Sequence, residues 1–249
     1  HETSRYTGIP LRTFGQQEAD IISIVDSITK YAVMITDPKQ IVYEMEKALY
    51  LAQTGRKGPV WIDVPLDIQN MRVRPEELEH FVTENGSNYD PLPEDIQYVS
   101  KVLRDSNRPA ILIGSGIWSA DAVRDLEGFL AKYPIPVTYA GSAPDTYGLD
   151  NPLSIGSVGT MGCSRAGNFT VQNSDLLLVL GCRLSPMTVG SDCDKFARAA
   201  KIVVVDIDRV EHSKNNVKID RLIIADVKKF LTSLMDEDTK RAHKEWRNK

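Results

Sequence analysis

Several glycines, acids and one arginine directly follow short apolar runs of this sequence. They are Gly114, Ser115, Gly116, Gly181, Arg183, Asp206, Ile207 and Asp208. Glycine lets a backbone approach a ligand and frees N–H groups for a phosphate, whereas a carboxylate accepts a hydrogen bond from a ribose hydroxyl. Arginine pairs with a phosphate or stacks on a planar ring. These residue types together predict a nucleotide-like binding site.

A second glycine-rich segment precedes a predicted helix. Gly156, Gly159 and Gly162 recur every three residues ahead of a helix expected over 164–173. The N-terminus of a helix presents unpaired N–H groups to an anion, so this segment is a further candidate for ligand binding.

Each of these features also has a purely structural interpretation. The Gly114–Gly116 segment lacks the third glycine of the dinucleotide fingerprint and has no acid about 20 residues later, which also disfavours a nicotinamide-dependent dehydrogenase. A plain tight turn therefore stays open for these glycines. Asp206 is equally suited to capping a turn or helix, and Arg183 to lying in solvent.

No catalytic or metal-binding constellation is predicted. His1, His80, His212 and His243 are scattered along the chain, and each is expected at the surface. Carboxylates such as Glu44 are expected on solvated faces of helices. We therefore assign no residue as a catalytic group or as a metal ligand.

The three cysteines give a hint of the compartment. Cys163, Cys182 and Cys193 are odd in number, and their spacings match no zinc pattern. We expect three free thiols in a reducing cytosol, and hence a cytoplasmic protein.

Five short apolar runs predict the strands that would carry these residues. They are 109–113, 135–139, 175–180, 201–205 and 221–224. The runs do not alternate with polar residues, which is typical of parallel strands buried on both faces by helices. Helices are expected over 120–132, 164–173 and 227–235. The predicted fold class is a doubly wound, Rossmann-like α/β domain, whose ligands bind at the carboxyl ends of the strands.

The first part of the chain predicts a smaller α/β segment. Asp37-Pro38 is a typical helix start, and the apolar residues that follow recur at helical spacing as far as Ala52. Strands are expected over 31–35 and 60–65. Residues 71–92 are polar and are predicted to be a linker between residues 1–70 and a domain over 93–235.

Length and charge exclude some classes of protein. The chain has 249 residues and a net charge of −4, and its first residue is His1, so we expect a processed chain or an excerpt. Its charge balance does not indicate a nucleic-acid partner, and no apolar run reaches the roughly 20 residues of a membrane span.

Three segments of the sequence indicate a protein family far more specifically than any glycine motif does. They are 54–69 (TGRKGPVWIDVPLDIQ), 174–183 (SDLLLVLGCR) and 205–208 (VDID). In order and spacing they resemble the acetolactate synthase family of thiamine-diphosphate-dependent enzymes. The resemblance covers nearly the whole chain and implies decarboxylation or carboligation of a 2-keto acid.

The resemblance also implies which parts of such an enzyme the chain holds. Family members have three α/β domains: the first binds the pyrimidine and holds an activating glutamate, and the third binds the diphosphate and Mg²⁺ through a Gly-Asp-Gly…Asn signature. Residues 1–70 resemble the C-terminal part of the first domain and 93–235 the middle domain, with 236–249 as a helix or linker toward a third domain. No Gly-Asp-Gly triplet occurs here. We expect an inactive fragment of a homodimeric or homotetrameric enzyme.

Flavin-containing members of the family hold FAD in the middle domain. The matching cofactor-binding positions are Arg56, Gly114, Ser115, Gly116, Gly159, Thr160, Gly162, Gly181, Arg183, Asp206, Ile207, Asp226 and Val227. The sequence departs from the flavin pattern at 184–187, where Leu-Ser-Pro-Met replaces Phe-Asp-Asp-Arg, and at Thr160-Met161, where a histidine is missing. Leu66 stands in place of a lysine near the substrate channel. The alternative is a non-catalytic FAD- or ADP-binding or assembly module.

Overall fold

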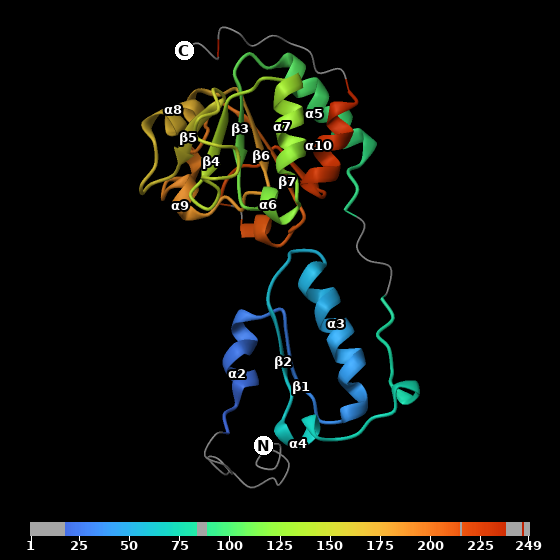
Figure 1. The fold of residues 1–249 in the computed structure, drawn as a ribbon. Coiled ribbons are helices and arrows are strands. Elements are labelled where there is room, and N and C mark those ends of the chain that lie inside the picture. Colours follow the sequence, from blue (N-terminus) through green and yellow to red (C-terminus); the bar gives the residue numbers. More distant parts are fainter. Residues whose placement is uncertain (1–17, 84–88, 215, 238–245, 247–249) are drawn as a thin grey trace. The chain divides into compact units, whose positions relative to one another are not determined.

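A computed structural model describes residues 18–83, 89–214, 216–237 and 246 (Figure 1). The chain divides into two compact units, residues 1–87 and 88–249, and each is described by itself. His1, His243 and most of the segment 236–249 lie outside the described residues.

The larger unit is built on a parallel sheet, which confirms the predicted α/β class. Its six strands lie in the order β5-β4-β3-β6-β7-β8. The strands are β3 (Pro109–Ile113), β4 (Val137–Ala140), β5 (Ser154–Val158), β6 (Leu176–Leu180), β7 (Lys201–Asp206) and β8 (Arg221–Ile224). All five predicted strands are present, with ends shifted by two residues at most. The edge strand β5 was not predicted.

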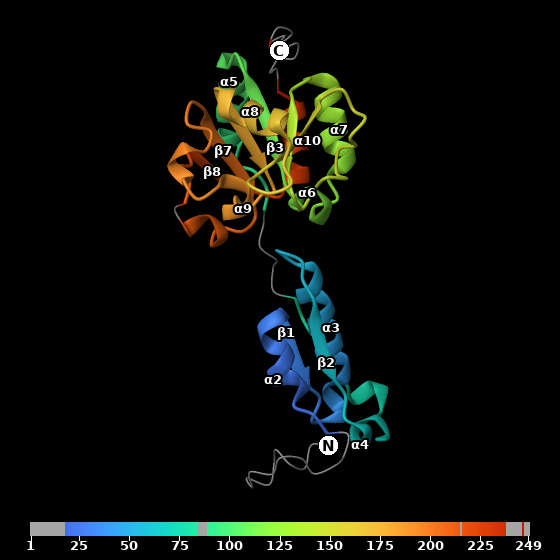
Figure 2. The ribbon, with the colours of Figure 1, turned by 90° about the vertical axis from the view of Figure 1, so that its left-hand side faces the viewer.

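Helices cover both faces of this sheet (Figures 1 and 2). Even and odd positions of the central strands face opposite sides, so Ile111 and Leu178 belong to one hydrophobic cluster and Leu112 and Val179 to another. Burial on both faces explains why these strands are apolar without alternation. The helical segments are α5 (Pro93–Asp105), α6 (Gly116–Ser119), α7 (Val123–Lys132), α8 (Arg165–Asn173), α9 (Pro186–Val189), η4 (Cys193–Lys195), η5 (Glu211–Lys214) and α10 (Val227–Met235).

The ends of the helices depend on N-cap hydrogen bonds and backbone conformation more than on the spacing of apolar residues. The helix expected from residue 120 begins at Val123, because Asp121 adopts a left-handed conformation with φ of 53° and interrupts it. Ser164 lies just outside α8 as its N-cap and accepts from the Gly167 amide. Helix α5 was not predicted.

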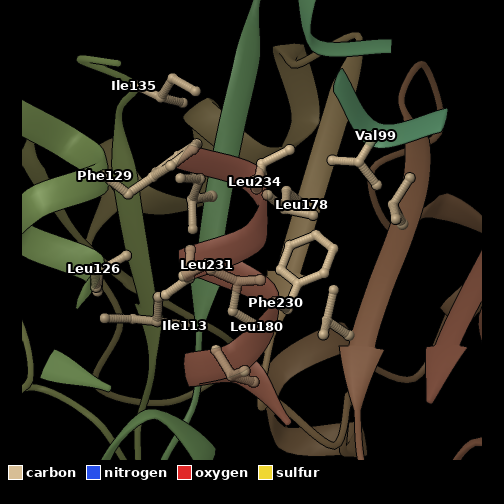
Figure 3. Packing of buried hydrophobic residues seen from close by; sticks show 14 of the residues in the cluster. Val99, Ile113, Leu126, Phe129, Ile135, Leu178, Leu180, Phe230, Leu231 and Leu234 are labelled. Atoms are coloured by element: carbon tan, nitrogen blue, oxygen red, sulfur yellow. The ribbon is translucent and has the colours of Figure 1, made fainter. Parts of the chain in front are cut away.

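The larger hydrophobic cluster centres on α10, which packs against α5 and α7 (Figure 3). Phe230, Leu231 and Leu234 are fully buried on one face of α10. Their spacing of one and three residues places them on a single helical stripe that faces the sheet, near Leu178 and Leu180 (Figure 3). Asp226 begins the helix by accepting from the Lys229 amide at 3.0 Å.

The smaller unit is a parallel pair of strands joined by a crossover helix. Strands β1 (Tyr31–Met34) and β2 (Val60–Asp63) pair in register, and α3 (Ile41–Gln53) connects them. Its other helical segments are α2 (Ile21–Val25), η1 (Asp26–Ile28), η2 (Pro38–Gln40), α4 (Leu66–Gln69) and η3 (Pro75–Glu77). The helical region begins at Asp37-Pro38, as predicted. The Asp37 side chain accepts a hydrogen bond from the Lys39 amide and caps η2, which leads directly into α3.

The faces of α3 differ from the expected ones. Met45 and Leu49, two of the apolar residues in the helical repeat, are 53% and 61% exposed, whereas Ala48 of the same repeat is buried. Glu44, expected in solvent, is buried and accepts a hydrogen bond from Tyr31. Burial of Tyr31 and this hydrogen bond raise the pKa of its hydroxyl. The prediction for Glu44 was wrong because a cross-element partner, which periodicity cannot show, compensates its burial.

Part of the segment 71–92 packs on α3. Phe81 contacts Tyr43 edge to face at 5.6 Å between ring centroids, and Glu46 accepts hydrogen bonds from the Phe81 amide and the His80 ring. His80 is exposed, as expected. The segment is therefore anchored to the smaller unit as far as residue 81.

We expect Phe230→Ala to lower the free energy of unfolding of the larger unit by about 3–5 kcal/mol, because it removes a fully buried ring at the centre of the core. Urea unfolding followed by circular dichroism measures this. Phe169→Ala is the matched control: its ring is 53% exposed on α8, so the loss should stay below about 1 kcal/mol. Equal losses in both variants would contradict the packing described.

Candidate functional site

The carboxyl edge of the parallel sheet brings together most of the predicted site. Its turns follow β3, β5, β6, β7 and β8, and they carry the predicted residues from Gly114 to Val227. The strand order reverses between β3 and β6, which is where ligands bind in open α/β sheets. Arg56 is the exception: it lies exposed in the smaller unit, after α3.

The turns on the two sides of this switch point touch each other. A Cβ on Gly114 would lie 2.3 Å from the Gly181 carbonyl oxygen, and one on Gly116 would lie 2.5 Å from the Gly181 Cα. The Gly114 amide donates to Leu180 at 3.0 Å and the Gly116 amide to Gly181 at 2.9 Å. These glycines permit a tight backbone contact, and two of their N–H groups already have acceptors. Ser115, between them, is exposed.

The Gly159–Gly162 loop is held against two helices. A Cβ on Gly159 would lie 2.5 Å from the Met187 carbonyl oxygen, which also accepts from the Thr160 amide at 3.0 Å. Asn168 of α8 accepts from the Gly159 amide at 3.1 Å and donates to its carbonyl at 3.0 Å. Gly162 has open space around it. Asn168 was not predicted as a site residue, although a mid-helix asparagine after a glycine loop is a usable signal.

The acids at the ends of β7 and β8 organise turns. The Asp206 Oδ1 accepts from the Asp208 amide at 2.9 Å, and the Asp208 Oδ1 accepts from the Glu211 amide at 3.0 Å. Asp226 caps α10, while Val227 is buried in the core. Each carboxylate thus has backbone partners in addition to any ligand that it would bind.

Arg183 pairs with a carboxylate that the sequence analysis did not single out. Its Nε lies 3.2 Å from the Glu211 Oε1, and the Lys214 ammonium contacts the same oxygen. Lys214 also donates to the Arg183 carbonyl. Two cations of the carboxyl edge therefore converge on Glu211. The i, i+3 spacing of Glu211 and Lys214 was the available signal for this pair.

His212 is buried, which corrects its expected place at the surface. Its side chain is 1% exposed, and its Nε2 lies 3.3 Å from the Asp206 Oδ2. Neither ring nitrogen has a partner with hydrogen-bond geometry among the described residues. The short turn η5 places this imidazole beside the carboxylate at the end of β7, and so short a turn carries no periodic pattern.

The described residues contain no group of three or more His, Cys, Asp or Glu side chains arranged for a metal ion. Within the same residues, no helix has the length and apolar character to cross a membrane. The three cysteines are free thiols, as predicted.

Comparison with known proteins gives one family. Residues 96–234 match the central domain of thiamine pyrophosphate enzymes. The chain is 33% identical over 234 residues to a probable acetolactate synthase large subunit of Methanocaldococcus jannaschii, covering 91% of this chain and 39% of that protein. It is 34% identical over 229 residues to the acetolactate synthase large subunit of Corynebacterium glutamicum, covering 91% and 36% respectively. The chain thus spans about two fifths of the length of these relatives.

We expect Gly114→Ala to lower the free energy of unfolding by about 1–3 kcal/mol, because the added methyl group meets rigid backbone at the switch point. Gly141→Ala is the matched control, since nothing lies within 4 Å of its Cβ, and it should change stability by less than about 1 kcal/mol. Urea unfolding of both variants measures the difference. Equal stability of the two would show that the turns are not in contact.

The thiol of Cys182 should be unreactive in the folded chain. Burial raises its pKa to about 11, which leaves about one thiol in a thousand ionised at pH 8. Alkylation with iodoacetamide, followed by peptide mass spectrometry, should therefore modify the partly exposed Cys193 well before Cys182. In urea the two rates should become similar, since the pKa of Cys182 returns to its ordinary value. Equal rates in the folded chain would contradict this burial.

Proposed function

Because the chain belongs to the thiamine pyrophosphate enzyme family through its central domain, we propose that it is part of an acetolactate synthase-like enzyme acting on 2-keto acids. The observation that carries this proposal is the extent of the similarity, which covers 91% of the chain and so continues beyond the central domain at 96–234. Its relatives over that extent are named acetolactate synthases.

In this proposal, residues 1–70 are the C-terminal part of a pyrimidine-binding domain. The parallel β1–β2 pair with its crossover helix α3 supports this, because such a unit is a piece of a larger α/β sheet. Residues 71–92 link it to the central domain at 93–235, and 236–249 lead toward a third domain. The whole enzyme would be cytoplasmic and a homodimer or homotetramer.

Thiamine diphosphate with Mg²⁺ would supply the chemistry of the whole enzyme, by stabilising the carbanion that forms when a 2-keto acid loses carbon dioxide. The sequence offers no Gly-Asp-Gly triplet to hold the diphosphate through a metal ion. We therefore place the Mg²⁺ site outside these residues, and the resemblance to the family implies the same for the activating glutamate. The contribution of this chain is the folded central domain, which positions its neighbours.

FAD does not fit the carboxyl edge as this chain builds it. The Gly114 and Gly116 amides already donate to backbone carbonyls, and the Arg183 guanidinium pairs with Glu211. A phosphate group here would find these backbone amides already paired and would lie beside the Glu211 carboxylate. The second candidate function, a module for subunit assembly without a bound nucleotide, is favoured over nucleotide binding by these same contacts.

We expect the 249-residue chain alone to turn over no 2-keto acid. Supplied with thiamine diphosphate, Mg²⁺ and pyruvate, it should release no more carbon dioxide than buffer, because its sequence has no Gly-Asp-Gly triplet to hold the diphosphate. A polypeptide encoded by the complete reading frame should be active under the same conditions and serves as the positive control. Turnover by the short chain would refute its inactivity, and a folded, inactive full-length protein would refute the proposed reaction.

A further inference from the structure

We propose that Glu211 is a built-in counter-ion, which occupies the place of a ligand phosphate at the carboxyl edge and closes this edge to flavins and other nucleoside diphosphates. The inference concerns the central domain alone. It stands whether or not the chain is part of a 2-keto acid enzyme.

The first observation behind this proposal is the position of Glu211. Its Oε1 lies 3.2 Å from the Arg183 Nε and also contacts the Lys214 ammonium. Arg183 follows β6 at the switch point, which is where the phosphates of a nucleotide would lie. An oxygen that already accepts from two cations there has the role that a phosphate oxygen would have.

The backbone fixes this carboxylate in place. The Glu211 amide donates to the Asp208 Oδ1 at 3.0 Å, which ties the start of η5 to the turn after β7. The Glu211 side chain is 19% exposed, whereas that of Arg183 is 59% exposed. A partly exposed ion pair is weak by itself. Glu211 therefore acts mainly by holding a negative charge where a diphosphate would enter, so that the two anions repel each other.

The same turn also places a side chain of this domain beside Asp206, the acid that would bind a ribose. His212, the next residue, brings its Nε2 to 3.3 Å from the Asp206 Oδ2, while the Asp206 Oδ1 accepts from the Asp208 amide. Both oxygens of Asp206 thus face groups of this chain. The four-residue turn η5 thus places Glu211 beside Arg183 and His212 beside Asp206, which are the cation and the acid that a nucleotide would need.

Calorimetric titration tests the proposal, with FAD, ADP and inorganic pyrophosphate as probes. The wild-type chain should show no saturable binding. Glu211→Gln keeps the shape of the side chain and removes its charge, so the affinity for ADP and pyrophosphate should rise by on the order of tenfold or more. Adding Arg183→Ala to Glu211→Gln should abolish this gain, because the phosphate loses its cation.

Glu94→Gln is the matched control. Glu94 also faces an arginine, with its Oε1 3.5 Å from the Arg221 Nη2, but this pair lies at the amino end of β8. Its neutralisation should leave binding unchanged. An equal gain in Glu94→Gln would show that only net charge matters and would overturn the proposal.

Two further outcomes would overturn it. One is saturable binding of FAD or ADP by the wild-type chain, which keeps the proposal falsifiable even where a variant fails to fold. The other is a folded Glu211→Gln, with a circular dichroism spectrum like that of wild type, which binds no better than wild type.

Discussion

The contact between the turn after β3 and the turn after β6 is the constraint on which the larger unit depends. Gly114 and Gly116 lie so close to Gly181 that no side chain fits between the two backbones. The contact continues the register of the central strands, in which Ile113 pairs with Leu180. It also fixes the start of α6, whose Ile117 is fully buried in the larger cluster. A wider gap at this point would move a helix and loosen the core.

The sequence predicted the parts of the fold that burial dictates. Strands β6 and β7 each have a neighbouring strand on both sides, and burial on both faces requires apolar runs such as LLLVL and IVVV, which are easily recognised. Strand β5, at one edge of the sheet, escaped prediction because of its composition. Its residues Ser154–Val158 are mostly half-buried and only two of them are apolar, so no apolar run marks it.

The position of the candidate site could be predicted from the sequence, but the side chains that contact Arg183 and Asp206 could not. The carboxyl edge follows from the strand pattern alone, and Arg183 and Asp206 were found there. Glu211 was missed and His212 was wrongly expected at the surface, because both lie on η5, a turn too short to have a periodicity, and because the pairing of Glu211 with Arg183 joins two separate turns. The position of the His212 ring beside Asp206 appears only once β7 and the turn are placed in space.

The two units differ in how well their own residues cover apolar side chains and pair charged groups. The smaller unit has two paired strands and exposes large apolar side chains, among them Ile28, Leu49 and Leu66. Two strands alone are marginally stable, and large exposed apolar side chains are typical of a surface that takes part in contacts. The larger unit is closed: its sheet is covered on both faces, and its carboxyl edge pairs its own cations and acids. In the proposed role of subunit assembly, a domain that pairs the charges of its own binding edge would need no ligand there, and its fold would be retained for the positions that it gives to its neighbours.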